Sequence, residues 1–295
     1  MPASTCASAC TRFRVQGRGR GAGLRVVTAA EAAAEADLIM VLAPDPVQGE
    51  IYEQHIAPAP EGRRRVVLRP RVQHPVRLRQ AAGRCGTSAW SRPRGPGHLV
   101  RRQYEEGRGV PCLVAVEQDA TGTAFELALS YAKGIGGTRA GVIRTTFTEE
   151  TETDLFGEQA VLAGGVTALV KAGFETLTEA GYQPEIAYFE CLHELKLIVD
   201  LMYEGGLGKM RWSISETAEW GDYVTGPRII TDATRAEMRK VLAEIQDGTF
   251  AREWMAEYHG GLKRYQEYKK QDSELLLETT GSELRKLMSW VDEEA

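Results

Sequence analysis

The hydrophobic pattern of the first 145 residues alternates between short apolar runs and stretches with helical spacing. Strands are predicted at 24–28, 37–42, 113–116 and 139–145, and helices at 29–36, 47–55 and 124–133. The run 37–42 (Asp-Leu-Ile-Met-Val-Leu) is typical of a parallel strand buried on both faces. Thr28 is placed to cap the helix that follows it, with Glu31 in the first turn. Strand, turn and helix in this order predict part of a doubly wound α/β sheet.

After residue 145 the apolar residues recur at helical spacing only. Helices are predicted at 161–180, 192–204, 233–246, 250–270 and 273–291. The sequence Glu204-Gly-Gly206 marks a helix stop, and Thr231 marks a helix start. The chain therefore divides into an α/β domain at 1–145 and an all-α domain at 146–295.

Composition and charge exclude several classes of protein. The 295 residues are 43% hydrophobic and 26% charged, which is ordinary for a soluble globular chain. The net charge of −5 gives no reason to expect nucleic acid as a partner. Five cysteines without a CxxC pair favour a reduced, cytoplasmic setting. No apolar run approaches the roughly 20 residues of a membrane span, and the N-terminus lacks a signal-peptide pattern.

Two pairs of carboxylates carry the strongest chemical signal. Asp154 and Glu158 lie four residues apart, as do Glu190 and Glu194, so each pair lies on one face of a helix. Like charges at this spacing repel by a few tenths of a kcal/mol, and a divalent cation would offset that cost. The alternative is that each pair is a solvated helix face.

Three motifs in the helical half resemble the C-terminal domain of ketol-acid reductoisomerase. They are Thr-Glu-Thr-Asp-Leu-Phe-Gly-Glu-Gln at 151–159, Phe-Glu-Cys-Leu-His-Glu-Leu-Lys at 189–196, and Trp-Ser-Ile-Ser-Glu-Thr-Ala-Glu-Trp-Gly-Asp at 212–222. The resemblance implies a knotted helical domain, in its single-copy form, that dimerises with a second copy or assembles into a higher homo-oligomer. It also implies that Asp154, Glu158, Glu190 and Glu194 hold two Mg²⁺ ions and that Ser215 touches the substrate.

The resemblance further implies a reaction and a cofactor. A 2-acetohydroxy acid would undergo a Mg²⁺-assisted alkyl migration and then reduction by NADPH to a 2,3-dihydroxy acid, on the route to valine and isoleucine. Pro44 and Gly97 would lie beside the cofactor. Arg94 stands where the family carries lysine, and Arg144 where it usually carries glutamate.

Four other residues of the motifs are assigned to packing. His193 is expected to be a core or supporting residue, because Mg²⁺ prefers oxygen ligands. Cys191 is expected to be a small buried residue. Trp212 and Trp220 are expected to pack around the loop that carries Ser215.

Residues 61–102 are anomalous, with twelve arginines, one acidic residue and no periodicity. Shifted by one base, codons for Arg69–His74 can read Ala-His-Gly-Phe-Asn-Ile, the family's catalytic-histidine motif. Residues 13–21 and 89–93 can likewise read as family segments. We therefore interpret parts of residues 1–94 as translated out of frame, with the histidine replaced near Pro70. The glycine-rich turn of the family is not found before Leu24, since 18–23 follows no apolar strand.

Two consequences follow from the out-of-frame interpretation. Residues 1–23 and 61–93 should be poorly ordered, and a well-packed sheet strand through 63–71 would contradict the interpretation. Two hypotheses then remain: a reductoisomerase, or a catalytically dead fragment that keeps the metal-binding, dimerising helical domain. For the chain as written, the damaged first domain favours the second.

Overall fold

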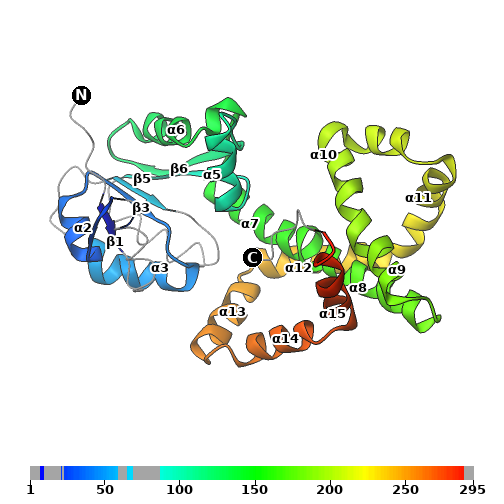
Figure 1. Cartoon of the computed structure of the whole chain (residues 1–295). Coiled ribbons are helices and arrows are strands. Elements are labelled where there is room, and N and C mark those ends of the chain that lie inside the picture. Colours follow the sequence, from blue (N-terminus) through cyan, green and yellow to red (C-terminus); the bar gives the residue numbers. More distant parts are fainter. Residues whose placement is uncertain (1–6, 10–20, 22, 59–64, 69–86, 289–295) are drawn as a thin grey trace. The chain divides into compact units, whose positions relative to one another are not determined.

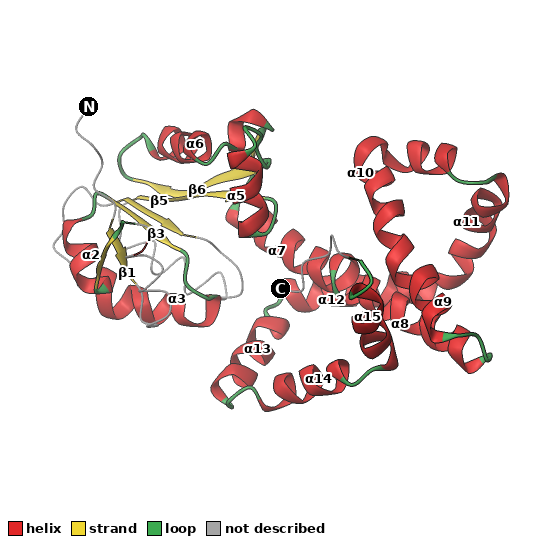
Figure 2. Cartoon of the chain, in the orientation of Figure 1, coloured by secondary structure: helices red, strands yellow, loops and turns green. Residues whose placement is uncertain are grey.

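The computed structural model describes residues 7–9, 21, 23–58, 65–68 and 87–288, which form two compact units divided between Thr153 and Asp154. Strands lie in the first unit, and the second consists of helices (Figure 2). Helix α7, Phe147–Gly157, begins in the first unit and ends in the second.

The first unit contains two sheets. The strands are β1 Ala7–Ala9, β2 Arg25–Val27, β3 Leu38–Val41, β4 Arg65–Leu68, β5 Thr87–Pro93, β6 Cys112–Asp119 and β7 Val142–Arg144. Strands β1 and β2 pair in parallel as a small sheet, and the other five pair in chain order. Only β5 and β6 run antiparallel among the described strands of the larger sheet, with a bulge between Ser88 and Ala89. The predicted α/β architecture is thus confirmed, with β6 and β7 running opposite to β3, β4 and β5.

Helices pack on this sheet because its strands carry apolar side chains on both faces. The helices of the unit are α2 Ala29–Glu35, α3 Asp45–Ile51, the π-helix η1 Tyr52–Ile56, α5 Gly97–Glu105, α6 Ala124–Gly134 and the short 3₁₀ turn η2 Gly137–Arg139. Ala89 of β5 packs with the alanines of α6, which are fully buried. Its neighbour Trp90 points to the opposite face, where it meets Phe147 edge-on at a ring distance of 5.8 Å. Successive side chains of a strand alternate in this way, so both faces are buried.

Three strands lie where no ordered elements are expected from the sequence. Strand β1 falls within 1–23, and β4 and β5 fall within 61–93. These short strands depart from the expectation, whereas most of 1–23 and 61–93 lies outside the described residues. Backbone pairing requires no particular side chain, and the β-branched pair Val66-Val67 suits a central strand. Strand β4, at 65–68, covers only part of 63–71, and the out-of-frame interpretation rests on the codon matches.

The second unit is a set of helices around one apolar cluster. Its elements after α7 are the π-helix η3 Glu158–Leu162, α8 Gly164–Glu179, α9 Pro184–Tyr188, the π-helix η4 Phe189–His193, α10 Glu194–Ser213, α11 Glu216–Ile229, α12 Asp232–Gln246, α13 Thr249–His259, α14 Lys263–Ser273 and α15 Leu276–Arg285. Val170 and Phe174 of α8 pack against Tyr188 of α9 and Leu284 of α15. The mostly helical second half is thereby confirmed.

Glycines break two helices of the second unit. Helix α10 contains a kink at Gly205 (φ −156°, ψ 20°) and Gly206 (φ 72°, ψ −173°), so the predicted stop is a bend rather than an end. Gly261 and Leu262 both have positive φ and separate α13 from α14, where a single helix at 250–270 is predicted. Glycine adopts positive φ readily, so Gly206 and Gly261 allow the chain to turn at these points.

The helical run Phe147–Glu179 is long and apolar enough to cross a membrane by length and composition alone, with 33 residues and a hydropathy of 1.3. Asp154 and Glu158 lie within it, and Ala163 leaves helical geometry (φ −123°, ψ −67°). Its buried residues Val170 and Phe174 contact other helices of the unit. The run therefore contributes buried residues to the apolar cluster on one side, while most of its apolar window is exposed in the single chain.

Candidate active site

The first acidic pair lies at the junction of α7 and η3. The Asp154 residue is buried, at 7% exposure, and Glu158, the first residue of the π-turn, is half-buried. A π-turn inside a helix is frequently found at a functional site. Two oxygen donors on one helix face, partly withdrawn from water, fit a hard cation such as Mg²⁺.

The second acidic pair lies at a π-turn as well. Glu190 falls within η4 and Glu194 begins α10, and both are exposed. Between them the His193 ring meets Phe189 edge-on at 5.2 Å. Cys191 packs on the apolar cluster of the unit, and burial, followed by the charge of Glu190, raises the pKa of its thiol. His193 and Cys191 therefore have the packing contacts that the sequence predicts.

The two pairs do not form one preassembled site in a single chain. Among the described residues, no group of three or more His, Cys, Asp or Glu side chains is arranged to hold a metal ion. The pairs belong to separate helical segments, which explains why the i,i+4 spacing of each pair does not by itself bring both together. Their role as metal ligands stays a prediction.

Ser215 lies at the start of α11. Its Oγ accepts a hydrogen bond from the backbone N–H of Ala218 at 3.2 Å, which makes it the N-cap of the helix. The residue is exposed. Trp212 and Trp220 are 85% and 68% exposed, so the expectation that they pack around this loop is wrong within one chain.

One contact in this region is not predicted from the sequence. The Nε of Arg211 lies 2.8 Å from Oδ2 of Asp222, so the end of α10 is tied to the middle of α11. Arginine and aspartate eleven positions apart have no local periodicity that would identify them as partners. The only available signal is their placement on either side of the Ser215 motif.

The expected cofactor residues lie at one edge of the larger sheet. Strands β3 and β5 both run parallel to β4, so their carboxyl ends share an edge. Pro44 follows β3 and precedes α3, and Gly97 opens α5 after β5. Nothing lies within 4 Å of the position where a side chain on Gly97 would begin. In doubly wound sheets this edge is where dinucleotides bind.

The turn after β3 is fixed by a buried side chain. Gln48, 4% exposed, donates from Nε2 to the carbonyl oxygen of Ala43 at 2.7 Å and to Oδ1 of Asp45 at 3.1 Å. These bonds hold the segment around Pro44 in place. The sequence around Pro70, where the histidine motif is expected, and residues 13–20 lie outside the described residues.

Arg94 and Arg144, which depart from the family pattern, have partners within the first unit. Nη1 of Arg94 lies 3.6 Å from Oε1 of Glu150, in the first turn of α7. The Arg144 guanidinium carbon lies 5.1 Å from the centre of the Phe125 ring. A cation over an aromatic face is stabilised at this distance.

A Rossmann-type sheet with a dinucleotide-binding edge, followed by a helical unit that carries acidic and polar side chains, defines a nicotinamide-dependent oxidoreductase. The family model described as "Ketol-acid reductoisomerase, C-terminal domain" matches residues 147–290. A second model, "Acetohydroxy acid isomeroreductase, NADPH-binding domain", matches residues 14–141. The chain belongs to the ketol-acid reductoisomerase family, whose members are oxidoreductases of branched-chain amino-acid biosynthesis.

Solved structures agree with this assignment. An NADH-preferring ketol-acid reductoisomerase from an uncultured archean is 38% identical, with a TM-score of 0.88 over 95% of this chain and 84% of that one. Two more distant structures share the fold alone. A semialdehyde dehydrogenase NAD-binding protein from Cupriavidus necator has 18% identity and a TM-score of 0.57 over 80% of this chain and 87% of its own. A pyrroline-5-carboxylate reductase from Coxiella burnetii has 12% identity and a TM-score of 0.57 over 82% and 87%.

Proposed function

We propose that the site serves the two-step reductoisomerase reaction, in which an alkyl group of a 2-acetohydroxy acid migrates and the product is reduced to a 2,3-dihydroxy acid. The observation that carries the proposal is the placement of both acidic pairs at π-turns of the unit that matches the family's C-terminal domain. A lone acidic pair on a regular helix would suit a solvated face equally well. Two pairs at two such turns favour a built site.

Asp154, Glu158, Glu190 and Glu194 would hold two Mg²⁺ ions. When bound, the two ions would act as Lewis acids on the oxygen atoms of the substrate and bring those atoms together. The four carboxylates would offset the charge of the cations, and Asp154, being buried, would do so away from water. The Ser215 hydroxyl would orient the substrate by donating its hydrogen to a substrate oxygen.

A second copy of the chain would complete the site. In one chain the two pairs are not gathered, and Glu190 and Glu194 are exposed. The helical unit also exposes many large apolar side chains, more than a monomer normally leaves in water. They include Val161, Leu162, Leu169, Ile186, Leu197, Val199, Tyr203, Leu207, Trp212, Trp220, Tyr223 and Ile229. We infer a homodimer, or a larger assembly, with a helical interface and the knotted topology of the family.

The nicotinamide cofactor would bind along the sheet edge that carries Pro44 and Gly97. We expect NADPH, although the archean relative is an NADH-preferring enzyme. Strand β4 ends at Leu68 on the same edge, directly before Arg69. A histidine motif placed after this strand would therefore reach the cofactor side of the sheet. A soluble, cytoplasmic protein is consistent with this function.

The alternative is that the chain is a catalytically dead fragment. Repair of the chain, including residues 69–74, distinguishes this alternative from an active enzyme. The chain as written has Arg-Pro-Arg at 69–71, and a general acid–base group contributes about 10² to 10⁴ in rate. We expect no NADPH consumption with 2-acetolactate and Mg²⁺ by the unaltered chain. We expect turnover once the reading frame is restored, so that 69–74 reads Ala-His-Gly-Phe-Asn-Ile, and the missing N-terminal strand with its glycine-rich turn is added. Turnover by the unaltered chain at a hundredth of the repaired rate would show that these segments are not out of frame. Loss of the turnover in Asp154→Asn of the repaired chain would tie the activity to the acidic site.

A further inference from the structure

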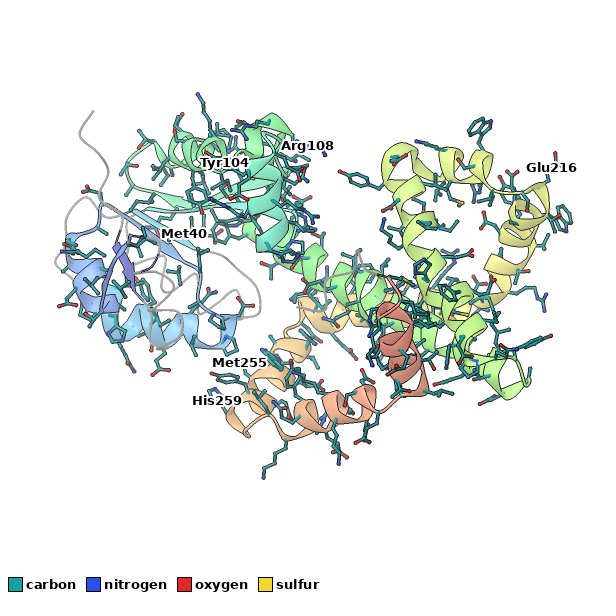
Figure 3. The ribbon with its side chains drawn as sticks, in the orientation of Figure 1. Met40, Tyr104, Arg108, Glu216, Met255 and His259 are labelled. Carbon is teal, nitrogen blue, oxygen red and sulfur yellow. The ribbon has the colours of Figure 1, made fainter. Side chains whose placement is uncertain are left out.

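Helices α10 and α11 form an arch in the second unit, and Ser215 lies at its turn. The chain rises along the first half of α10, bends at Gly205–Gly206, continues to Ser213 and then returns along α11 (Figure 1). Glu216, the residue after Ser215, stands at the outer end of the arch in Figure 3. A turn at such a place keeps a defined shape only if the two helices beside it are tied together.

Arg211 connects the end of α10 to α11 through two contacts of its guanidinium group. Its Nε lies 2.8 Å from Oδ2 of Asp222, and its Cζ lies 4.6 Å from the centre of the Tyr223 ring. A planar guanidinium can accept an ion pair at its edge and an aromatic ring on its face at the same time, which an ammonium group cannot do as well. The two contacts fix both the distance and the orientation of α11 relative to the end of α10.

The contacts continue from Tyr223 to the N-cap itself. The Tyr223 hydroxyl donates to Oε1 of Glu219 at 3.1 Å. The backbone N–H of Glu219 in turn donates to the carbonyl oxygen of Ser215 at 2.9 Å, and that of Ala218 donates to the Ser215 Oγ at 3.2 Å. Arg211 is thus connected to both oxygen atoms of Ser215 through one helix turn.

We propose that Arg211 is a positioning residue, which orients the Ser215 hydroxyl toward the substrate by locking α11 to the end of α10. The proposal rests on the proposed function, in which Ser215 donates to a substrate oxygen. Because the Ser215 Oγ accepts from Ala218, the cap fixes the position of the oxygen from which the hydroxyl would donate to the ligand. Arg211 itself reaches Asp222 and Tyr223, and its role is exerted through the cap.

The guanidinium group of Arg211 keeps its positive charge over the working pH range. The pKa of Arg211 is raised, mainly by its hydrogen bond to Asp222. Burial opposes this with a smaller effect, and the charges of Asp222, Tyr223 and Glu219 also raise the pKa. Arg211 and Asp222 are 27% and 36% exposed, so water and salt reach them in part. At high salt concentration the ion pair with Asp222 would weaken, whereas the stacking of the Arg211 guanidinium on the Tyr223 ring would persist.

The test compares Arg211→Met and Arg211→Lys with Arg239→Met, which removes a charge from the exposed surface of α12. Hydrogen exchange at the Ala218 and Glu219 amides reports the cap without any ligand. We expect exchange to accelerate roughly threefold to tenfold in Arg211→Met, the factor that one hydrogen bond contributes. Arg211→Lys should recover part of the protection, and Arg239→Met should leave it unchanged. Unchanged exchange in Arg211→Met would overturn the proposal.

Titration with 2-acetolactate in the presence of Mg²⁺ then tests whether the tie acts through Ser215. We expect Arg211→Met and Ser215→Ala each to weaken binding roughly threefold to tenfold. Arg211→Met should add nothing in the Ser215→Ala background, because the two changes act on one contact. Additive losses would show that Arg211 acts elsewhere and would overturn the proposal.

The outcomes separate this proposal from the function on which it rests. If Ser215→Ala binds as tightly as the unaltered chain, or the unaltered chain does not bind, the substrate contact of Ser215 fails and the proposal fails with it. If Ser215→Ala weakens binding but Arg211→Met does not, only the positioning role is overturned. Circular dichroism of each variant shows whether the helices remain folded.

Discussion

The guanidinium group of Arg92, in β5, forms an ion pair with the carboxylate of Glu150, in the first turn of α7, and both side chains are buried, at 6% and 0% exposure. The pair joins the sheet to the helix that carries Asp154 one turn later. Arg94 adds a second cation at 3.6 Å from Glu150 Oε1. Two positive groups therefore surround one buried acid.

Removing the acid should destabilise the first unit. Breaking a buried pair leaves an uncompensated charge, and we expect Glu150→Ala to lower the free energy of unfolding by about 3–5 kcal/mol. Urea denaturation measures the change. The matched control is Glu149→Gln, at an exposed neighbour. If Glu150→Ala unfolds at the same urea concentration as this control, the pair does not hold α7 to the sheet.

The bend in α10 should depend on glycine at position 206. Its φ of 72° and ψ of −173° lie in a region that essentially only glycine adopts. We expect Gly206→Ala to cost about 1–3 kcal/mol in thermal or chemical unfolding. Gly208→Ala is the control, because Gly208 lies in the following helical turn with open space around its Cα. That change should be neutral or stabilise by up to about 1 kcal/mol. Equal effects of the two changes would contradict a bend fixed by backbone geometry.

Asp119 should make stability depend on pH at the start of α6. Desolvation raises the pKa of Asp119, but hydrogen bonds from the Ala124 backbone and from Thr121 outweigh it, so the pKa lies below its ordinary value of 3.8. A carboxylate with a lowered pKa stabilises the folded state above its unfolded pKa, and this contribution is lost as the pH falls through the lowered value. Asp119→Asn should therefore destabilise at neutral pH, and the difference from the unaltered chain should shrink below about pH 3.9. Denaturation at several pH values measures it, with Glu126→Gln as a control on the same helix. A difference that stays constant down to pH 2 would contradict the linkage.

Mg²⁺ binding should require Glu190. If the acidic pairs hold the metal, Glu190→Gln removes a charged ligand, and calorimetric titration should show binding weakened by about tenfold or more. Glu185→Gln, at an exposed acid of α9, is the control for the loss of one negative charge. Equal Mg²⁺ affinity in Glu190→Gln and the unaltered chain would remove this pair from the site.

The exposed apolar surface of the helical unit predicts a dimer at micromolar concentration. Light scattering should give twice the chain mass or more, and Leu197→Glu should shift it toward the monomer, because Leu197 is 51% exposed on α10. A charge added on the polar surface, such as Gln266→Glu at an exposed position of α14, provides the control. A stable folded monomer of the unaltered chain would contradict the helical interface.

The local elements follow from the sequence where the signal is local. Thr28 and Glu31 form the predicted cap reciprocally, with the Thr28 backbone N–H donating to Glu31 at 2.8 Å. Thr231 caps α12, and the strand predicted at 37–42 is β3 at Leu38–Val41. Cap and burial patterns depend on neighbours within a few positions, so a single sequence contains them.

The elements that the sequence does not disclose depend on distant partners. Strand β4 forms between β3 and β5, although its surroundings are rich in arginine, because pairing on both sides supplies the backbone bonds. The Arg92–Glu150 and Arg211–Asp222 pairs join residues from different elements. No hydrophobic or polar periodicity in the sequence identifies such pairs. Both acidic pairs are visible in the sequence, but whether they share a cation depends on tertiary or subunit contacts.

The π-turns at η3 and η4 have a consequence for insertions and deletions in this chain. A π-turn is one residue longer than an ordinary helical turn, and one residue corresponds to a rotation of about 100° around the helix axis. The extra residue allows Asp154 of α7 and Glu158 of η3 to share one face while α8 places Val170 and Phe174 in the apolar cluster. Deleting one residue from 158–162 would keep the helix and its composition, yet it would turn one set of side chains away from its surroundings. The length of this segment is thus as much a determinant of the site as the identity of its carboxylates.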